Sequence, residues 1–454
     1  MNLLMGFIAI GNSFKHSLTA PMSNDKLWQK DSTQRQALVE AFTLGRDPEF
    51  DLLLAPYDVQ GTRAHIQMLE KVGLLTPIEL QQLLGGLDQI AAEIQDGSFV
   101  IEPGVEDVHS QVELLLTRRI GEAGKKIHTG RSRNDQVALD IKLYLRAEVQ
   151  LLKQQVLDLF ELLLHLSERF KEHLLPGYTH LQTAMPSSFG LWLGAYAEAL
   201  VDDMTLLLAA EQVIDKNPLG SGAGYGSAFP LDRAMTTELL GFRTLNVNSV
   251  YAQMSRGKTE KILAMAMGNL GSTLARLAMD GCLYLSPNFG FISFPSEWTT
   301  GSSIMPHKKN PDLFELVRAK CNRLQALPNE LSLLLTNLPS GYHRDLQLTK
   351  EILFPALQDL KQCFSILQEA LPHLEVRPNL LQDPTYQYLF SVEAVNELVK
   401  AGSSFRDAYR EVGNQIEAGQ FHWDTQKSLD HQHLGSIGNL GTEHIRAAMQ
   451  ALTA

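Results

Sequence analysis

Apolar residues recur at helical spacing through most of the chain, whereas the alternation typical of strands is nearly absent. Residues 31–97 follow a helical pattern, in which Thr76, Pro77 and Glu79 supply an N-cap, a first-turn proline and a capping-box partner. Further helical patterns cover about 187–216, 258–285, 311–336, 392–401 and 405–418, followed by a glycine-rich, weakly patterned end. The pattern predicts an all-α fold.

The stretch between Arg131 and Leu175 determines the architecture that we expect. Between Arg131 and Leu175 there is neither glycine nor proline, and apolar residues keep helical spacing throughout. A single helix of this length would span roughly 60 Å, and leucines around much of its circumference indicate burial among other helices. We therefore expect a long central helical bundle that assembles with other subunits.

The expected organisation has four parts. They are an extension or flexible tail at 1–22, an N-terminal helical domain at 23–127, the central long-helix bundle at 128–370 and a small C-terminal helical domain at 371–454. Met22 is a candidate start, and the apolar run at residues 3–10 lacks the basic flank of a secretory signal. No run is expected to be long enough to span a bilayer.

Composition narrows the choice of partners and compartment. The formal net charge of −12 gives no general nucleic-acid footprint, so an anion site must be assembled locally. Three widely spaced cysteines fit free thiols in a reducing compartment, and we expect a cytoplasmic protein.

Residues 301–312 carry the densest candidate chemistry. Asn310 and Pro311 are read as the N-cap and first residue of a helix, so its N-terminal dipole adds to the charges of Lys308 and Lys309. This combination suits a negatively charged ligand or transition state. From composition alone, a solvated basic loop that caps a helix explains the same residues equally well.

Two polar loops flank the long helix, at residues 128–135 and 176–182. Because a helix of about 60 Å separates them, they cannot serve one site within one subunit. If both serve catalysis, different subunits bring them together. A third polar loop, at 341–351, precedes a later helix and is read from composition alone as an exposed connection.

Cofactor and metal motifs are not recognised. The glycine loop at 220–226 follows a helix rather than a strand and lies in no βαβ unit, so a turn between helices is the preferred interpretation. There is no His-Glu-x-x-His motif and no cysteine pair at ligand spacing. We expect no cofactor and no metal, and His109 alone is explained better as a helix-surface histidine than as a functional residue.

Together, the motifs resemble the fumarase/aspartase superfamily, and within it most closely the argininosuccinate lyases. Residues 301–312 resemble the superfamily signature loop, with Lys-Lys-Asn-Pro-Asp at 308–312 as in argininosuccinate lyases. Segments 107–110, 128–136, 177–182, 342–350 and 405–408 resemble family motifs in the family's order. The likeness covers roughly residues 50–415.

The resemblance implies an all-helical homotetramer with each active site drawn from three chains, and a reversible elimination that cleaves a C–N bond to release fumarate. It implies Ser302 as the base, His180 as the acid that assists the leaving nitrogen, Glu315 as the residue that orients His180, and Lys308 as a stabiliser of negative charge. The implied substrate-binding residues are His109, Ser132, Arg133, Asn134, Thr179, Gln182, Ser303, Asn310, Tyr342, Gln347 and Lys350.

Two segments depart from the family pattern. Ser255-Arg256-Gly257-Lys258 stands where the family usually has Ser-Asp-Arg-Asp, and Leu348-Thr349 replaces two acids. Lyases acting on adenylosuccinate, aspartate or another aminodicarboxylate therefore stay open as alternatives, as does an inactive structural homologue.

Overall fold

The computed structural model describes residues 37–425 and 427–454. The expected tail at 1–22, the candidate start Met22 and the apolar run at 3–10 lie outside this range. The described chain is dominated by helices, as expected. They are α1 (Ala37–Leu44), α2 (Asp47–Lys71), α3 (Pro77–Gln95), α4 (Val108–Ile120), α5 (Arg133–Arg169), α6 (Phe189–Ile214), α7 (Arg233–Leu239), α8 (Ser249–Met254), α9 (Lys258–Leu285), α10 (Asp312–Leu324), α11 (Leu327–Leu334), α12 (Leu348–Ala370), α13 (Ser391–Lys400), α14 (Phe405–Glu417) and α15 (Thr442–Thr453).

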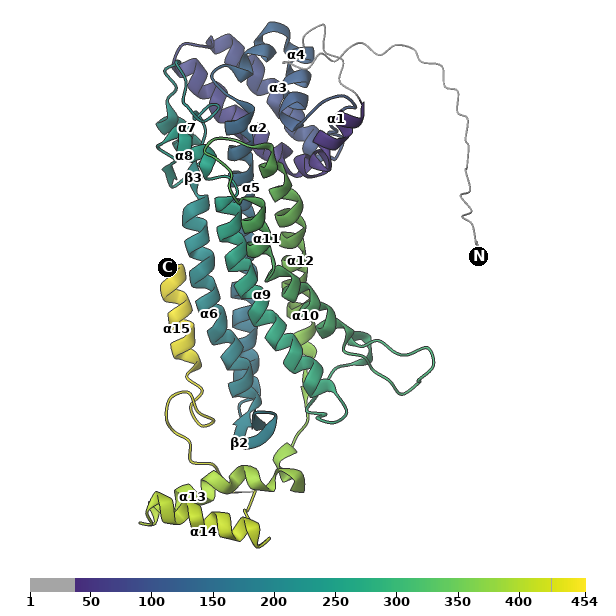
Figure 1. Ribbon diagram of the computed structural model, residues 1–454, viewed down its shortest axis with the longest axis vertical. Helices are drawn as coiled ribbons and strands as arrows, with labels where there is room; N and C mark the ends of the chain where they lie inside the picture. The colour runs from purple at the N-terminus through teal and green to yellow at the C-terminus, as the bar shows by residue number, and fades with distance from the viewer. Residues whose placement is uncertain (1–36, 426) are drawn as a thin grey trace, which may run out of the picture.

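The long helices α5, α6, α9 and α12 run side by side along the molecule (Figure 1). Helix α5 packs against α6 and α12, while α9 packs against α6 and α10. Their facing apolar side chains form the largest buried cluster of the described residues. The helices α2 to α4 enclose a second core at one end, and the segment around α13 and α14 encloses a third at the other end.

Helix α9 corrects one expectation about apolar runs. Its 28 residues pass the length and hydropathy criteria for a membrane span, so the prediction that no run is long enough was wrong. However, 61% of its most apolar window is buried inside the bundle. Packing against α6 and α10 therefore accounts for the buried apolar residues of α9.

Short strands interrupt the helices in places that the sequence pattern did not indicate. Strand β1 (Leu174–Thr179) pairs antiparallel with β2 (Gln182–Ser188), and the long helix ends at Arg169 rather than near Leu175. The other strand pairs are β3 (Lys216–Asn217) with β4 (Thr244–Leu245) and β5 (Ile292–Ser293) with β6 (Glu375–Val376).

Helix boundaries confirm some local predictions and correct others. Thr76 forms the expected capping box with Glu79. The pattern at 311–336 is two helices, α10 and α11, with Pro328 at the start of the second. In the region expected to be weakly patterned, α15 packs beside α6 and returns the chain to the bundle (Figure 1).

The close approach of α9 and α10 depends on Gly271. A Cβ atom at this position would lie 2.9 Å from the carbonyl oxygen of Cys321 and 3.3 Å from Cβ of Leu324. Gly271→Ala should therefore push the helices apart and lower the free energy of unfolding by about 1–3 kcal/mol, as measured by urea denaturation. Gly85→Ala is the matched control in α3, where a Cβ meets nothing within 4 Å. The control should raise stability by roughly 0.5–1 kcal/mol, and equal effects would contradict the packing explanation.

Candidate active site

The start of α5 forms one wall of the site. Ser132 caps the helix, because its Oγ accepts a hydrogen bond from the N–H of Asn134 (3.3 Å) and its own N–H donates to Oδ1 of Asp135 (2.8 Å). The buried Asp135 also accepts hydrogen bonds from the N–H groups of Gly220 (3.0 Å) and Gly222 (2.9 Å). The glycine loop that follows α6 thus anchors the N-terminus of α5.

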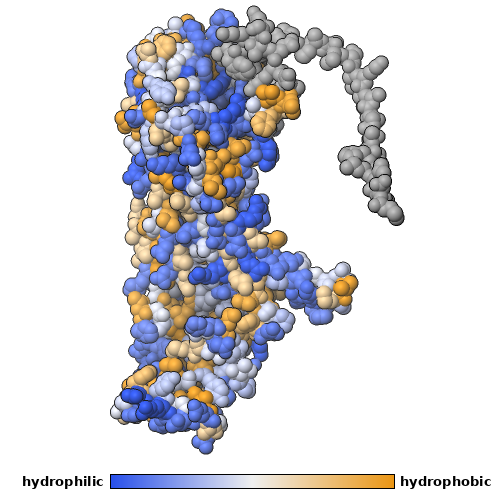
Figure 2. All heavy atoms as spheres, in the orientation of Figure 1, coloured by the Kyte–Doolittle hydropathy of each residue, from blue (hydrophilic) through white to orange (hydrophobic). Residues whose placement is uncertain are grey.

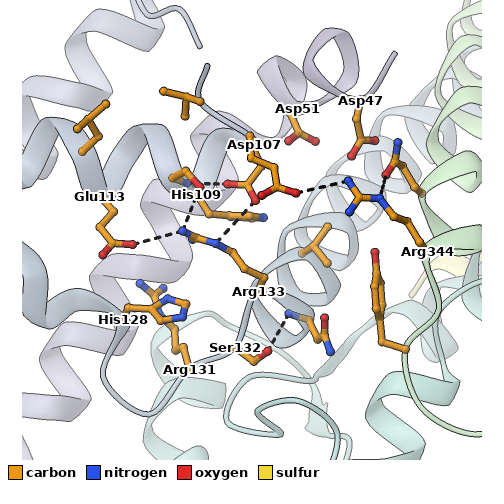
Figure 3. A pocket seen from close by; sticks show the side chains of 18 of the residues that line it. Asp47, Asp51, Asp107, His109, Glu113, His128, Arg131, Ser132, Arg133 and Arg344 are labelled. Atoms are coloured by element: carbon orange, nitrogen blue, oxygen red, sulfur yellow. Dashed lines mark hydrogen bonds and ion pairs between the residues drawn. The ribbon is translucent and has the colours of Figure 1, made fainter. Parts of the chain in front are cut away.

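A cavity of about 840 Å³ opens beside this wall (Figure 3). Its lining comes from α2, α4 and the loop before it, the start of α5, and the loop before α12. It brings together the predicted substrate-binding residues His109, Ser132, Arg133, Asn134, Tyr342, Gln347 and Lys350. Sequence motifs far apart in the chain therefore meet around one space.

Arg133 is held at the cavity wall by residues of α4 and α5. Its Nη2 donates to Oγ of Ser110 (3.1 Å) and lies 3.3 Å from Oε2 of Glu113, and its Nη1 donates to Gln136 (3.3 Å). Asp107, which caps α4, lies 3.7 Å from its Nε. This network fixes the guanidinium in position before any ligand arrives.

Two further residues of this wall were not among the predicted site residues. Arg131 is buried and donates to Thr62 (3.0 Å), but its Nε and Nη2 have no hydrogen-bond partner among the described residues. Burial and the neighbouring guanidinium groups of Arg133 and Arg131 lower the pKa of His128 to about 4, so this ring is neutral at pH 7. Arg131 and His128 both lie in segment 128–136, which resembles a family motif. Their place in that segment could have identified them as site residues.

His109 lies buried between two carboxylates. Its Nδ1 is 2.8 Å from Oδ1 of Asp58 and 3.3 Å from Oδ2 of Asp140. Burial opposes the charge, but the carboxylates of Asp58 and Asp140 outweigh it and raise the pKa of His109 to about 9. The expectation of a surface histidine was therefore wrong.

The ligand atoms of Asp58, His109 and Asp140 lie within 4.8 Å of one another, a spacing that would suit a metal ion. With a pKa of about 9, His109 carries protons on both ring nitrogens at pH 7, so a metal ion would have to displace one of these protons to bind there. As the structure stands, Asp58 and Asp140 hold the protonated imidazole of His109 between them.

The raised pKa of His109 predicts a pH dependence of stability. Its contribution is fully present below the unfolded pKa of 6.5 and is lost as pH rises through the folded pKa of about 9. The rise of the His109 pKa from 6.5 to about 9 corresponds to about 3 kcal/mol of unfolding free energy. We expect the stability difference between the wild type and His109→Gln, measured by urea denaturation, to shrink between pH 6.5 and 9.5. The exposed His444→Gln is the control and should follow the wild type, and a constant His109→Gln difference would contradict the charge assignment.

The opposite side of the cavity is built around Lys350. Its buried Nζ lies 2.6 Å from Oδ1 of Asp47 and 2.6 Å from Oδ1 of Asp51. Sequence reasoning missed these two acids, whose signal was a four-residue spacing at the start of α2. Lys350 is therefore already paired with carboxylates of its own chain.

The remaining residues on this side are also tied to the protein. Gln347 donates through Nε2 to the backbone oxygens of Thr43 (3.2 Å) and Leu44 (3.0 Å). Arg256, in the segment that departs from the family pattern, lies 3.3 Å from Glu260 and donates to the carbonyl of Leu346 (3.3 Å). The departing segment thus steadies the turn at Leu346 that precedes Gln347 and the start of α12, where Lys350 lies.

A second group of predicted residues lies at the other end of α5, in the β1–β2 hairpin. Thr179 and Gln182 form its last pair, and the turn residues His180 and Leu181 have φ values of 54° and 57°. Thr179, His180 and Gln182 are exposed. Helix α5 has 37 residues, so about 55 Å separates this hairpin from the cavity.

A third group lies on a loop that projects from the bundle before α10 (Figure 1). Thr300 and Asn310 close its base through paired backbone hydrogen bonds (3.4 and 2.8 Å). Oγ of Ser302 accepts hydrogen bonds from the N–H groups of Ile304 (3.3 Å) and Met305 (3.1 Å). These N–H groups favour a negatively charged oxygen on Ser302, which fits the role expected of it.

The other loop residues include one correction. Asn310 does not cap α10, because its Nδ2 donates to the carbonyl of Gly301 (3.2 Å) and Pro311 occupies the cap position without a side-chain hydrogen bond. Ser303, Lys308 and Glu315 are exposed. Among the described residues, no hydrogen bond or ion pair joins Glu315 to His180. Within one chain, the cavity, the hairpin and the loop are therefore three separate groups.

Comparison with known proteins identifies relatives along nearly the whole chain. A sequence family described as Lyase matches residues 30–326. An argininosuccinate lyase from Bacteroides fragilis is 58% identical over 425 residues, covering 94% of this chain and 94% of that protein. One from Bacteroides thetaiotaomicron is 57% identical over 425 residues, covering 94% and 95%.

Among solved structures, an EDDS lyase variant with bound fumarate superposes with a TM-score of 0.75 and 22% identity, covering 93% of this chain and 91% of that chain. This likeness confirms the expected all-α bundle fold. The sequence matches identify the family as well as the fold, since they extend over both the bundle and its two ends. The chain is thus an enzyme of the lyase family in the fumarase/aspartase superfamily, and it belongs to the argininosuccinate lyases.

Proposed function

We propose that the protein catalyses the reversible elimination of argininosuccinate to fumarate and arginine, a step of arginine biosynthesis. The observation that carries this proposal is the meeting of Ser132, Arg133 and Asn134, at the N-terminus of α5, with Tyr342, Gln347 and Lys350 around one cavity. A guanidinium at the positive end of a helix dipole favours an anionic ligand, because both stabilise negative charge. The succinyl part of argininosuccinate supplies two carboxylates.

The reaction begins with removal of a proton from the succinyl carbon next to a carboxylate. The resulting negative charge spreads into that carboxylate, so the site must stabilise a group that approaches two negative charges. Arg133, Ser132 and Asn134, at the N-terminus of α5, are suited to this task, since the helix dipole adds to the charge of the guanidinium. Thr179 and Gln182 are proposed to complete the carboxylate contacts from another chain.

Ser302 is the proposed base, and its hydrogen bonds from Ile304 and Met305 support this role. Lys308, Asn310 and Ser303 of the same loop would stabilise the developing charge. His180, oriented by Glu315 in the assembled enzyme, would donate a proton to the leaving nitrogen as the C–N bond breaks. The electron pair of the carbanion then forms the double bond of fumarate.

This chemistry requires several chains, and we propose a cytoplasmic homotetramer with shared sites. The tips of the hairpin and the loop support it, because each presents an apolar side chain to solvent in the single chain, Leu181 (78% exposed) and Ile304 (82% exposed). Figure 2 shows further apolar side chains on the outer faces of the bundle. Those most exposed on the long helices are Leu151, Leu206 and Met265. Burial against partner helices would remove these groups from water.

The direct test is to incubate the purified protein with argininosuccinate and to follow fumarate and arginine. Release of both in equal amounts is expected, and release of neither would refute the proposal. The reverse reaction, with fumarate and a panel of amines, distinguishes the alternatives: preference for adenosine monophosphate or ammonia over arginine would indicate an adenylosuccinate or aspartate lyase. No turnover with any amine would indicate an inactive homologue.

A further inference from the structure

The glycine loop at residues 220–226 curls around the carboxylate of Asp135, the third residue of α5. Oδ2 of this acid accepts hydrogen bonds from the N–H groups of Gly220 (3.0 Å) and Gly222 (2.9 Å), and Oδ1 accepts one from the N–H of Ser132 (2.8 Å). The side chain is completely buried. Backbone N–H groups that converge in this way form a nest for an anion. Here the anion is a carboxylate of the protein itself.

The nest requires glycine at both donor positions. Gly220 and Gly222 have φ values of 82° and 60°, in the left-handed region that other residues rarely adopt. A Cβ atom on Gly222 would lie 2.9 Å from the carbonyl oxygen of Gly226. One on Gly220 would lie 2.8 Å from Cγ of Arg233. A turn between helices would not by itself require two donors aimed at one carboxylate, so the loop is shaped to hold Asp135.

The hydrogen bond from Ser132 connects this nest to the active site. Residues 132–134, which we call the carboxylate-binding turn, line the cavity and are proposed to bind the dicarboxylate part of the substrate. Asp135 does not line the cavity in the described part of the chain. It holds the turn through one oxygen and the glycine loop through the other. The placement of the turn therefore depends on a side chain that a ligand does not touch.

The charge of Asp135 makes its hydrogen bonds strong, since bonds to an ionised acceptor exceed those to a neutral one. Burial raises the pKa of Asp135 to about 6, although the N–H groups and the guanidinium of Arg131 act in the opposite direction. The guanidinium of Arg233, in α7, also acts on this carboxylate. Asp135 is thus ionised at pH 7, and protonation below pH 6 would remove part of its capacity to accept hydrogen bonds.

We infer that Asp135 is a positioning residue for the carboxylate-binding turn, and that the glycine loop serves the reaction by cradling its side chain. This inference rests on the proposed function, because it concerns the same site. In Asp135→Asn, one acceptor oxygen becomes an NH₂ group, which would face backbone N–H groups and could not accept their hydrogen bonds. The turn should then shift and bind carboxylates less tightly. The competing explanation is that Asp135 only caps α5, as Glu79 caps α3.

The experiment measures the reverse reaction, in which fumarate and arginine bind to different parts of the site. In Asp135→Asn, KM for fumarate should rise about tenfold or more, as for the loss of a hydrogen bond to a charged group, while KM for arginine changes less than about twofold. The matched control is Glu79→Gln, which removes the charge from the capping box of α3, away from the cavity lining, and should leave both KM values unchanged. A lowered melting temperature of Asp135→Asn with both KM values unchanged, or equal rises of the two, would overturn the inference.

Two glycine variants test the cradle independently, should Asp135→Asn fail to fold. Gly222→Ala displaces an N–H donor of the nest and should raise KM for fumarate. Gly226→Ala carries similar backbone strain, with φ at 80°, but its Cβ would approach only Oγ of Ser249, at 3.7 Å, so KM should change less than about twofold. Equal rises in the two variants would contradict a role for the nest.

Binding of fumarate, measured by isothermal titration calorimetry, requires neither turnover nor arginine. The Kd of the wild type should rise below pH 6 toward that of Asp135→Asn, whereas a Kd equal in the two proteins at pH 7 would refute the role of Asp135. A wild type that binds fumarate but forms no argininosuccinate would refute the proposed function alone, since the comparison of Kd values still decides the role of Asp135.

Discussion

Ser302→Ala is expected to lower kcat by about a thousandfold or more while the protein stays folded. The substitution removes the oxygen that accepts hydrogen bonds from the N–H groups of Ile304 and Met305, and with it the proposed base. Folding should be unaffected, because residues 301–309 lie in an exposed loop whose base is closed by Thr300 and Asn310. Steady-state kinetics and a thermal melt of the same sample measure the two effects.

The matched control for this prediction is Ser303→Ala, the neighbouring hydroxyl in the same loop. No hydrogen bond to the Ser303 hydroxyl is seen among the described residues, and its proposed role is to stabilise charge rather than to remove the proton. Its loss should therefore lower kcat measurably but far less than the loss of Ser302. Activity of Ser302→Ala near that of the wild type would reject Ser302 as the base. Equal, severe losses for both serines would instead point to loop conformation as the cause.

Mixing inactive subunits should restore activity if the sites are built across chains. A Ser302→Ala subunit retains His180, and a His180→Ala subunit retains Ser302. After random exchange of equal amounts, up to about a quarter of the sites would combine an intact Ser302 from one chain with an intact His180 from another. The measurement is fumarate release before and after subunit exchange.

The control for exchange is a mixture of two preparations of Ser302→Ala, which should stay inactive. Exchange itself must be verified independently, for example by mass spectrometry of differently tagged subunits. No recovery in a verified mixture would show that Ser302 and His180 of one chain act together, which would contradict the proposal of sites shared between chains.

The fold was predictable because its strongest signals are local. The absence of glycine and proline from the stretch that became α5, together with its apolar spacing, required a long helix whatever the rest of the chain did. Its end was misplaced by a few residues, because β1 forms by pairing with β2 and that pairing is not visible in the helical pattern. Similarly, α15 follows Gly441 and was missed because the glycines before it weaken the pattern.

The candidate site was predictable where a motif keeps its residues together and not where packing assembles them. Ser132, Arg133 and Asn134 are adjacent in sequence and stand together at the start of α5. Asp47, by contrast, reaches the cavity only because α2 lies against the start of α12, a contact between segments about 300 residues apart. For Asn310 a local motif gave a wrong prediction. Its side chain donates a hydrogen bond within the loop instead of capping the helix that follows.

The return of α15 to the bundle restrains the segment that contains α13 and α14. This segment leaves the bundle after α12 and rejoins it at α15, where Thr442 donates to Glu168 and Arg446 pairs with Glu161. It is thus held at both ends, like a domain inserted into a loop, rather than hanging from a single tether. Deleting α15 would therefore free one of two anchors and allow the segment to swivel, even though none of the residues at the proposed site is removed.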